Sequence, residues 1–222
     1  MTREQVLSIV DHTLLKADAT WEQIKVICDE AVENKTASIC INPGFVKKAV
    51  QYLNGKVPVC TVIGFPLGAT STNAKVLEAK QALEDGAEEF DMVINISALK
   101  DKDYDYVCGE IAAIKAAVGD KVLKVIIETC LLTDEEKRIM CDLVIKGGAD
   151  FIKTSTGFST GGATFEDIAL FKECVGDKIK IKAAGGIRSV ADMEKFISLG
   201  ANRLGTSSAI KIYNAQDTGN DY

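Results

Sequence analysis

The sequence predicts an α/β protein built as a single-domain (β/α)8 barrel of the TIM type. Eight short apolar segments suit buried strands, and amphipathic stretches that suit helices separate them. Neighbouring segment centres lie about 21 to 33 residues apart, the length of one strand plus one helix. The centres lie near Val10, Ile39, Cys60, Met92, Val125, Ile152, Ile181 and Leu204. Strands that alternate with helices form parallel sheets, and eight such units favour a closed barrel.

An open, doubly wound sheet is the structural alternative. It would accommodate the same alternation of strands and helices. The sequence contains neither GxGxxG nor GxxxxGK[ST], so the dinucleotide-binding and P-loop members of that class gain no support.

Helix boundaries are marked at both ends of several amphipathic stretches. A Thr or Ser followed three residues later by Gln, Glu or Asp is typical of a helix start. Such pairs are Thr20 with Gln23 and Thr133 with Glu136, and, in weaker form, Thr164 with Asp167 and Ser189 with Asp192. A Gly-Ala pair follows three stretches, at residues 86–87, 148–149 and 200–201, and glycine commonly ends a helix.

The whole chain, residues 1–222, is predicted to form one domain. Only three prolines occur and no segment has low complexity, so a long linker is not expected. A short extra segment precedes the first strand. Residues 213–222 are mostly polar, and we expect them to form a mobile C-terminal tail.

Composition excludes several classes of partner. The chain carries 26 Lys and Arg against 32 Asp and Glu, a net charge of −6, which disfavours a nucleic-acid surface. No apolar run approaches the length of a membrane span, and no signal peptide is evident. Seven cysteines without a CxxC pair, and a single histidine, predict free thiols in the cytoplasm. We expect no metal and no cofactor.

Charged residues occupy strand positions that should be apolar. In residues 121–128 one face carries Lys124 and Glu128, whereas the other carries apolar residues suited to helix packing. Asp91, Lys153 and Lys182 lie within other predicted strands. Such residues are rarely buried without partners. They indicate either a ladder of structural ion pairs, such as Lys124 with Glu128 or Asp91, or an active site at the carboxyl ends of the strands.

Two inward lysines on successive strands favour nucleophilic chemistry. A lysine amine is a nucleophile only when neutral, so its pKa must fall from about 10.4, through burial or a neighbouring cation. Lys153 and Lys182 would supply that arrangement, and the nucleophile would form a Schiff base with a carbonyl substrate. Asp91 is placed to act as general base, directly or through water.

Glycine-rich loops follow the last strands. Gly185-Gly186 comes after the seventh strand, and Gly205-Thr206-Ser207-Ser208 follows the eighth. In this fold, such loops bind phosphate through backbone N–H groups. Thr156-Gly157, after the sixth strand, would add donors. The alternative is that these are tight turns without a ligand.

At eight places the chain resembles the deoxyribose-phosphate aldolases, a family of class I, Schiff-base aldolases. The matching motifs follow one another in family order over nearly the whole chain. They are DHTLL (11–15), SICINP (38–43), GFPLG (64–68), EFDMV (89–93), LKVIIE (123–128), FIKTSTG (151–157), KAAGGIR (182–188) and GTSS (205–208).

The resemblance implies reversible cleavage of 2-deoxy-D-ribose 5-phosphate to acetaldehyde and D-glyceraldehyde 3-phosphate, in deoxyribose phosphate catabolism. It implies that Lys153 forms the Schiff base, that Lys182 lowers the pKa of the Schiff-base lysine, and that Asp91 is the acid/base, with Lys124 in a proton relay. Asp11 belongs to the same pocket. The resemblance also implies a homodimer or homotetramer.

The family pattern points to two further site residues, and this chain departs from the pattern at two other positions. Cys40 matches a pocket cysteine that an aldehyde can trap, although a small core residue is the simpler interpretation. Tyr222 matches a terminal tyrosine that assists proton transfer in some members. Phe158 stands where some members carry a phosphate-binding lysine, which leaves more of the phosphate binding to the glycine and serine loops. Ala183 replaces a common proline, a mild change.

Two other functions are compatible with the same residues. The chain could be another phosphosugar lyase or isomerase in which the lysines act only electrostatically. It could also be a non-catalytic sugar-phosphate-binding protein, although the lysine pair and Asp91 argue against this.

Overall fold

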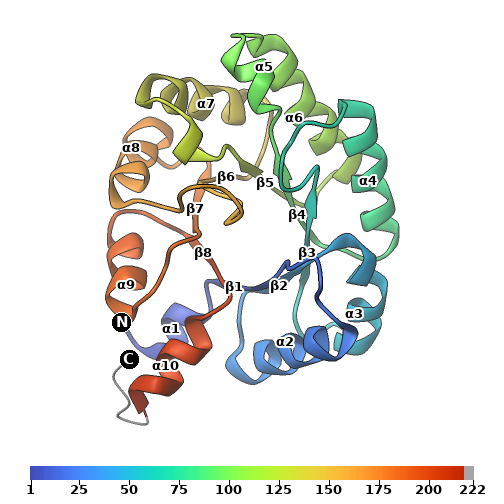
Figure 1. Ribbon diagram of the computed structural model, residues 1–222, viewed down its shortest axis with the longest axis vertical. Coiled ribbons are helices and arrows are strands. Elements are labelled where there is room, and N and C mark those ends of the chain that lie inside the picture. The colour runs from blue at the N-terminus through green and yellow to red at the C-terminus, as the bar shows by residue number, and fades with distance from the viewer. Residues whose placement is uncertain (218–222) are drawn as a thin grey trace.

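Eight parallel strands close into one barrel in sequence order, each strand pairing with the next and β8 with β1 (Figure 1). The computed structural model describes residues 1–217. The strands are β1 (Val10–Leu14), β2 (Ser38–Ile41), β3 (Val59–Ile63), β4 (Glu89–Val93), β5 (Val122–Ile126), β6 (Phe151–Lys153), β7 (Lys180–Ala184) and β8 (Arg203–Thr206). All eight predicted strands and the closed barrel are confirmed, and the open sheet is excluded.

A ring of helices surrounds the barrel (Figure 1). They are α1 (Arg3–Leu7), α2 (Trp21–Asn34), α3 (Val46–Leu53), α4 (Thr72–Glu84), α5 (Ile96–Lys100), α6 (Tyr104–Val118), α7 (Asp134–Lys146), α8 (Phe165–Val175), α9 (Val190–Ser198) and α10 (Ala209–Asp217). Two 3-10 turns, η1 (Pro43–Phe45) and η2 (Thr129–Leu131), follow β2 and β5. The extra N-terminal segment is α1, which packs beside α10.

The predicted helix starts are present. The side chains of Thr20 and Thr133 form complete capping boxes, whereas Thr164 and Ser189 accept only the backbone N–H three residues later. The side chain of a Gln or Glu is long enough to reach back to the N–H of the capping residue. An Asp side chain is one carbon shorter and does not, which accounts for the difference. The glycines that follow the helices, at residues 86, 148 and 200, have positive φ as predicted.

The C-terminal boundary differs from the predicted one. We expected a mobile tail from residue 213, but residues 213–217 belong to α10 and the Tyr213 ring is buried. The guanidinium of Arg3 lies 5.7 Å from the centre of this ring, so α1 and α10 hold each other. The remaining tail, residues 218–222, lies outside the described residues.

The main apolar core lies between the barrel and its helices, whereas the barrel interior holds the charged side chains and a small apolar cluster. Leu123, Val125 and Ile127 are completely buried on the helix-facing side, as predicted. The inward positions of the same strands carry charged residues instead. Stability therefore comes from the outer layer, which leaves the interior available for charged chemistry.

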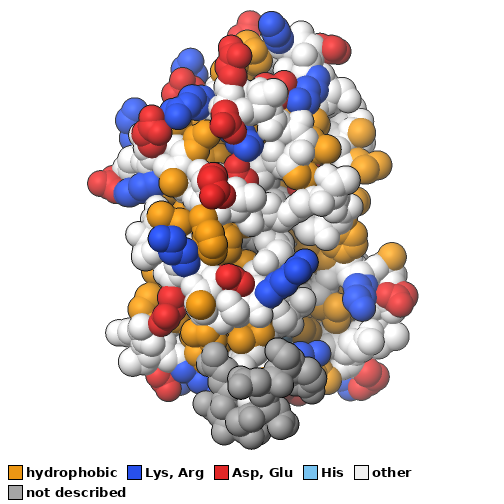
Figure 2. All heavy atoms as spheres, turned by 60° about the vertical axis from the view of Figure 1, so that its left-hand side comes forward, with side chains coloured by type: hydrophobic (Ala, Val, Ile, Leu, Met, Phe, Trp, Pro, Cys, Tyr) orange, Lys and Arg blue, Asp and Glu red, His pale blue; other side chains and the backbone are white. Residues whose placement is uncertain are grey.

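The outer surface carries charges of both signs. On the face that shows α7, α8 and α9, acidic and basic side chains are interspersed (Figure 2). Among residues 1–217, no helix has the length and apolar character needed to cross a membrane.

One ion pair is completely buried outside the barrel. The Lys75 ammonium on α4 lies 2.8 Å from the Glu110 carboxylate on α6 and donates to the Val93 carbonyl. Glu110 in turn accepts the backbone N–H of Asn95. The pair thus fastens the end of β4 to two helices. Because Lys75 Cε would lie 2.7 Å from a Cβ at position 64, Gly64 leaves the space for its side chain.

We predict that Glu110→Ala strongly destabilises the fold. It leaves the Lys75 ammonium buried without a carboxylate, which should lower the free energy of unfolding by about 3–5 kcal/mol. Urea denaturation followed by circular dichroism measures this. The control, Asp177→Ala, breaks an exposed pair with Lys172 and should leave the midpoint unchanged. Equal midpoints for the two variants would contradict the prediction.

Candidate active site

Strand pairing brings the predicted charged residues together. Asp91 on β4 is the register partner of Lys124 on β5, and Lys153 on β6 is the register partner of Lys182 on β7. Register partners in a sheet point to the same side, so all four side chains enter the barrel interior. Each of these side chains is at most 4% exposed.

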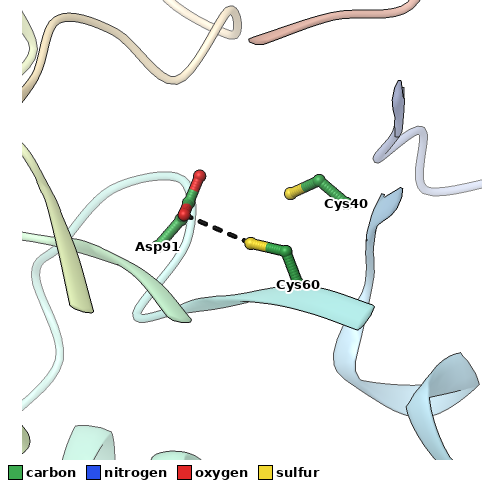
Figure 3. A group of neighbouring side chains, drawn as sticks. All are labelled: Cys40, Cys60 and Asp91. Carbon is green, nitrogen blue, oxygen red and sulfur yellow. Dashed lines mark hydrogen bonds between the residues drawn. The ribbon is translucent and has the colours of Figure 1, made fainter. Parts of the chain in front are cut away.

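Asp91 is the centre of this group. Its Oδ2 atom accepts hydrogen bonds from Lys153 Nζ at 2.7 Å and Lys182 Nζ at 2.6 Å. Its Oδ1 atom accepts from Lys124 Nζ at 2.9 Å and from the Cys60 thiol at 3.2 Å. Figure 3 shows the Cys60 sulfur pointing toward this carboxylate. One buried carboxylate therefore binds three ammonium groups.

A second set of charges lies beside the first. Asp11 forms ion pairs with Lys182 and with Arg203, and it accepts a hydrogen bond from the Ser38 hydroxyl at 2.7 Å. Glu89 bridges Lys124 and Arg203. Glu89 and Arg203 are not among the site residues predicted from the sequence, although both occupy inward positions of predicted strands.

The charges do not cancel when every group is ionised. Three carboxylates face four cations: Asp11, Glu89 and Asp91 against Lys124, Lys153, Lys182 and Arg203. Burial alone would raise the pKa of Asp91, but Lys124, Lys153 and Lys182 outweigh it and hold that pKa well below its ordinary value. Burial would lower the pKa of Lys182, but Asp11 and Asp91 raise it above the ordinary value.

A pocket of about 420 Å³ opens above this group. Lys153 is the only one of the cluster's three lysines that lines it. The pocket also gathers the predicted phosphate-binding residues from three different loops. These are Thr156, Gly157, Gly185, Gly186, Gly205, Ser207 and Ser208.

Gly205 lines the pocket and also makes room for a buried side chain. It lies within β8 rather than in the loop that follows, and a Cβ at this position would lie 3.0 Å from Lys182 Cε. Gly205 therefore provides room for the buried lysine. The Thr206 hydroxyl accepts the N–H of Ser208, which fixes the loop after β8.

Glu128 orients Thr156 instead of pairing with Lys124. β5 ends at Ile126, and Glu128 adopts a left-handed backbone with φ of 55°. Its carboxylate accepts the Thr156 hydroxyl at 2.5 Å and the Thr156 N–H at 3.2 Å. The suggested Lys124–Glu128 pair was wrong. The strand ends before Glu128, so the alternation of side chains between the two faces does not extend to that residue. Of the suggested partners, Asp91 is the one that Lys124 binds.

Lys16 and Phe158 complete the pocket wall. Lys16, in the loop after β1, is exposed and lines the pocket. Lys16 is not among the predicted site residues, although its position two residues beyond a strand end is a usable signal. Phe158 is 53% exposed and packs edge-on against Phe65, with ring centres 5.2 Å apart.

Five predicted site residues within the described range do not line the pocket, namely Asp11, Cys40, Asp91, Lys124 and Lys182. Cys40 is buried among Leu15, Cys60 and Val62 inside the barrel, as the core interpretation expected. Tyr222 lies outside the described residues.

Cys40, Cys60 and Asp91 also offer three potential metal ligands within 4.8 Å of one another (Figure 3). Three ammonium groups already bind Asp91, and their positive charge opposes a divalent cation at this place.

Comparisons with known proteins point to one family. The sequence profile of the DeoC/LacD family aldolases matches residues 5–214. A deoxyribose-phosphate aldolase from Clostridioides difficile is 61% identical over 215 residues, which cover 97% of this chain and 98% of that protein.

Solved structures agree with the sequence relatives. The structure of QR15, an aldolase, superposes with a TM-score of 0.92 at 41% identity and covers 96% of both chains. A tetrameric deoxyribose phosphate aldolase from Aeropyrum pernix superposes with a TM-score of 0.87 at 31% identity, covering 98% of this chain and 93% of the other.

We predict that the Asp91 carboxylate makes its full contribution to stability above about pH 4, the pKa of aspartate in an unfolded chain, and loses that contribution progressively below it. Its folded-state pKa is depressed, so its contribution is lost as the pH falls toward that value. Asp91→Asn should therefore reduce the slope of unfolding free energy against pH by about 1.4 kcal/mol per pH unit below pH 4.

Urea denaturation at several pH values measures the slope. Asp142→Asn, an exposed carboxylate on α7, is the control and should keep the wild-type slope. If Asp91→Asn does not fold, Asp11→Asn tests the same cluster, because the pKa of Asp11 is also lowered. A wild-type slope in both cluster variants would disprove the pairing.

Proposed function

The chain belongs to the DeoC/LacD family of aldolases, and on this premise we propose that Lys153 is the Schiff-base nucleophile of a deoxyribose-phosphate aldolase. The reaction is the reversible cleavage of 2-deoxy-D-ribose 5-phosphate to acetaldehyde and D-glyceraldehyde 3-phosphate. One observation carries the assignment to Lys153. It is the single lysine of the buried cluster whose side chain lines the pocket.

The ion pairs of the two lysines support the assignment to Lys153. Lys182 pairs with two carboxylates, Asp11 and Asp91, whereas Asp91 is the one carboxylate that pairs with Lys153 among residues 1–217. Asp11 and Asp91 raise the pKa of Lys182 above its ordinary value against the effect of burial, so Lys182 stays a cation and is a poor nucleophile.

The neutral amine would add to the aldehyde carbon of the open-chain sugar and lose water to form an iminium ion. Removal of the proton from the C3 hydroxyl then breaks the C2–C3 bond, and the bonding electrons enter the iminium as an enamine. D-Glyceraldehyde 3-phosphate leaves as the aldehyde. Protonation of the enamine carbon and hydrolysis of the new iminium release acetaldehyde and restore the amine.

Asp91 would transfer protons in this sequence, directly or through water, because its Oδ2 contacts Lys153. Lys124 and Lys182 bind the same carboxylate and would keep it ionised between steps. The role implied for Tyr222 falls on a residue outside the described range.

The phosphate would lie at the opposite end of the pocket. Gly185 and Gly186 from the loop after β7, and Ser207 and Ser208 from the loop after β8, offer backbone N–H groups there. Lys16 adds a cation at the same opening. Among residues 1–217, no carboxylate lies within ion-pair distance of its ammonium, so it is available for an anion.

We also propose a homodimer or homotetramer in the cytoplasm. The tetrameric relative from Aeropyrum pernix supports an oligomer, and seven free cysteines fit a reducing compartment. Size-exclusion chromatography with light scattering would decide between the two assemblies, and a monomer would contradict both.

We predict that borohydride traps the Schiff base at Lys153. Reduction in the presence of acetaldehyde should add one ethyl group to the peptide that contains Lys153. The substitution Lys153→Ala should prevent this addition and should also abolish release of glyceraldehyde 3-phosphate. Peptide mass mapping and a coupled assay measure the two effects.

The matched control is Lys180→Ala. Lys180 lies on β7 at the exposed end of the strand and does not line the pocket. The Lys180→Ala variant should be modified at Lys153 by borohydride and acetaldehyde, and should release glyceraldehyde 3-phosphate, as the wild type does. An ethyl group found only on other lysines, or full activity in Lys153→Ala, would refute the assignment.

We predict that Lys16 contributes to phosphate recognition. Lys16→Gln should lower kcat/KM for deoxyribose 5-phosphate about tenfold, since a hydrogen bond to a charged group is worth about 1.5–3 kcal/mol. It should leave kcat/KM for unphosphorylated deoxyribose unchanged. Lys195→Gln, in the last turn of α9 and away from the pocket, is the control. Equal losses for both substrates would assign Lys16 another role.

A further inference from the structure

Two cysteines lie side by side inside the barrel, and the proposed reaction uses neither thiol as a reacting group. Cys40 on β2 and Cys60 on β3 are register partners. Both side chains point into the interior, and their sulfur atoms lie within 4.8 Å of each other (Figure 3). They are 1% and 0% exposed.

The spacing of the strands is compatible with a disulfide between these two positions. Neighbouring strands lie about 4.8 Å apart. Disulfides join Cα atoms that are roughly 4.4 to 6.8 Å apart, so register partners can be bridged mainly by side-chain rotation.

The two thiols are chemically different. The neighbouring Cys60 side chain lowers the pKa of Cys40, and Lys182 and Lys153 lower it further, against the effects of burial and of Asp91. Burial raises the pKa of Cys60 well above its ordinary value. Cys40 is therefore the better nucleophile, and Cys60 is the thiol beside it that can complete a disulfide.

A small molecule can approach the pair from the pocket. Cys40 and Cys60 pack against Leu15 and Phe65. Leu15 lines the pocket, and Phe65 contacts Phe158 in its wall. The cysteine pair therefore adjoins side chains of the pocket wall, and hydrogen peroxide is nearly as small as water.

We propose that Cys40 and Cys60 are an oxidisable pair that forms a reversible disulfide when hydrogen peroxide enters the pocket. The Cys40 thiolate attacks one peroxide oxygen, the O–O bond breaks, and the second oxygen leaves as hydroxide, which becomes water. Cys60 sulfur then attacks the resulting sulfenic acid, and the S–O bond breaks. That oxygen leaves as water with the Cys60 proton. Two thiols are oxidised and one peroxide is reduced to two waters.

The disulfide would disable the centre of the site. In the reduced protein, Cys60 donates to Asp91 Oδ1 and accepts from Lys124 Nζ at 3.3 Å. A disulfide removes the donor and turns the sulfur toward Cys40. Asp91 then loses one of the contacts that orient it between the lysines, and aldolase activity falls.

The test treats the reduced full-length chain with hydrogen peroxide, alkylates the remaining thiols and maps disulfide-linked peptides without reduction. We expect a linked pair that contains Cys40 and Cys60. We also expect activity to fall about 10- to 100-fold, since a hydrogen bond to a charged group is lost. Dithiothreitol should restore it.

Three variants separate the pair from the other thiols. In the Cys60→Ser variant, oxidation by peroxide should stop at a sulfenic acid on Cys40, which dimedone traps. The Cys40→Ser variant should have the same aldolase activity before and after treatment with peroxide. Cys130→Ser removes an exposed cysteine outside the pair and should behave as the wild type does.

The proposal is overturned if peroxide links other cysteines but not these two, or if Cys40→Ser loses activity as the wild type does. The activity readout rests on the proposed function, whereas the peptide map does not. A chain without aldolase activity that still forms the Cys40–Cys60 link would refute only the proposed function.

Discussion

The buried carboxylate of Asp91 is the interaction on which the rest of the site depends. Three ammonium groups converge on its two oxygens, and among residues 1–217 Asp91 is the one carboxylate that pairs with Lys153. A buried ion pair seldom adds net stability, because desolvation consumes most of the attraction. The barrel maintains this expensive group because its apolar core lies elsewhere, between the strands and the helices. The separation of the two layers lets a stable fold contain a reactive interior.

The closed parallel barrel is what brings these charges into contact. Asp91 and Lys124, and Lys153 and Lys182, meet because their strands are neighbours in register. Asp11 reaches Lys182 because β8, which lies between β1 and β7, presents a glycine at position 205. A single added methyl group at that position would collide with the lysine stem. The chemistry thus relies on the spacing of strands at least as much as on the identity of the charged residues.

Much of the fold and part of the site could be predicted from the sequence. Apolar segments at regular spacing locate strands, and alternation within residues 121–126 assigns Lys124 to the interior. What alternation cannot supply is the partner of each inward residue, because partners depend on register between strands far apart in the chain. Glu89 and Arg203 were missed for this reason. The Lys124–Glu128 suggestion failed because the chain leaves the extended conformation at Glu128, and no local pattern announces a left-handed residue there.

The two neighbouring lysines acquire different roles from small differences in their surroundings. Lys182 is held by Asp11 as well as Asp91 and does not line the pocket, so its charge is compensated and a substrate cannot reach it. Lys153 shares Asp91 with two other cations and lines the pocket. Removal of a proton from Lys182 would leave two carboxylates with less compensation. Access and electrostatics select the same lysine. Asp11 is the carboxylate that distinguishes the two lysines, since it pairs with Lys182 and raises the pKa of that lysine.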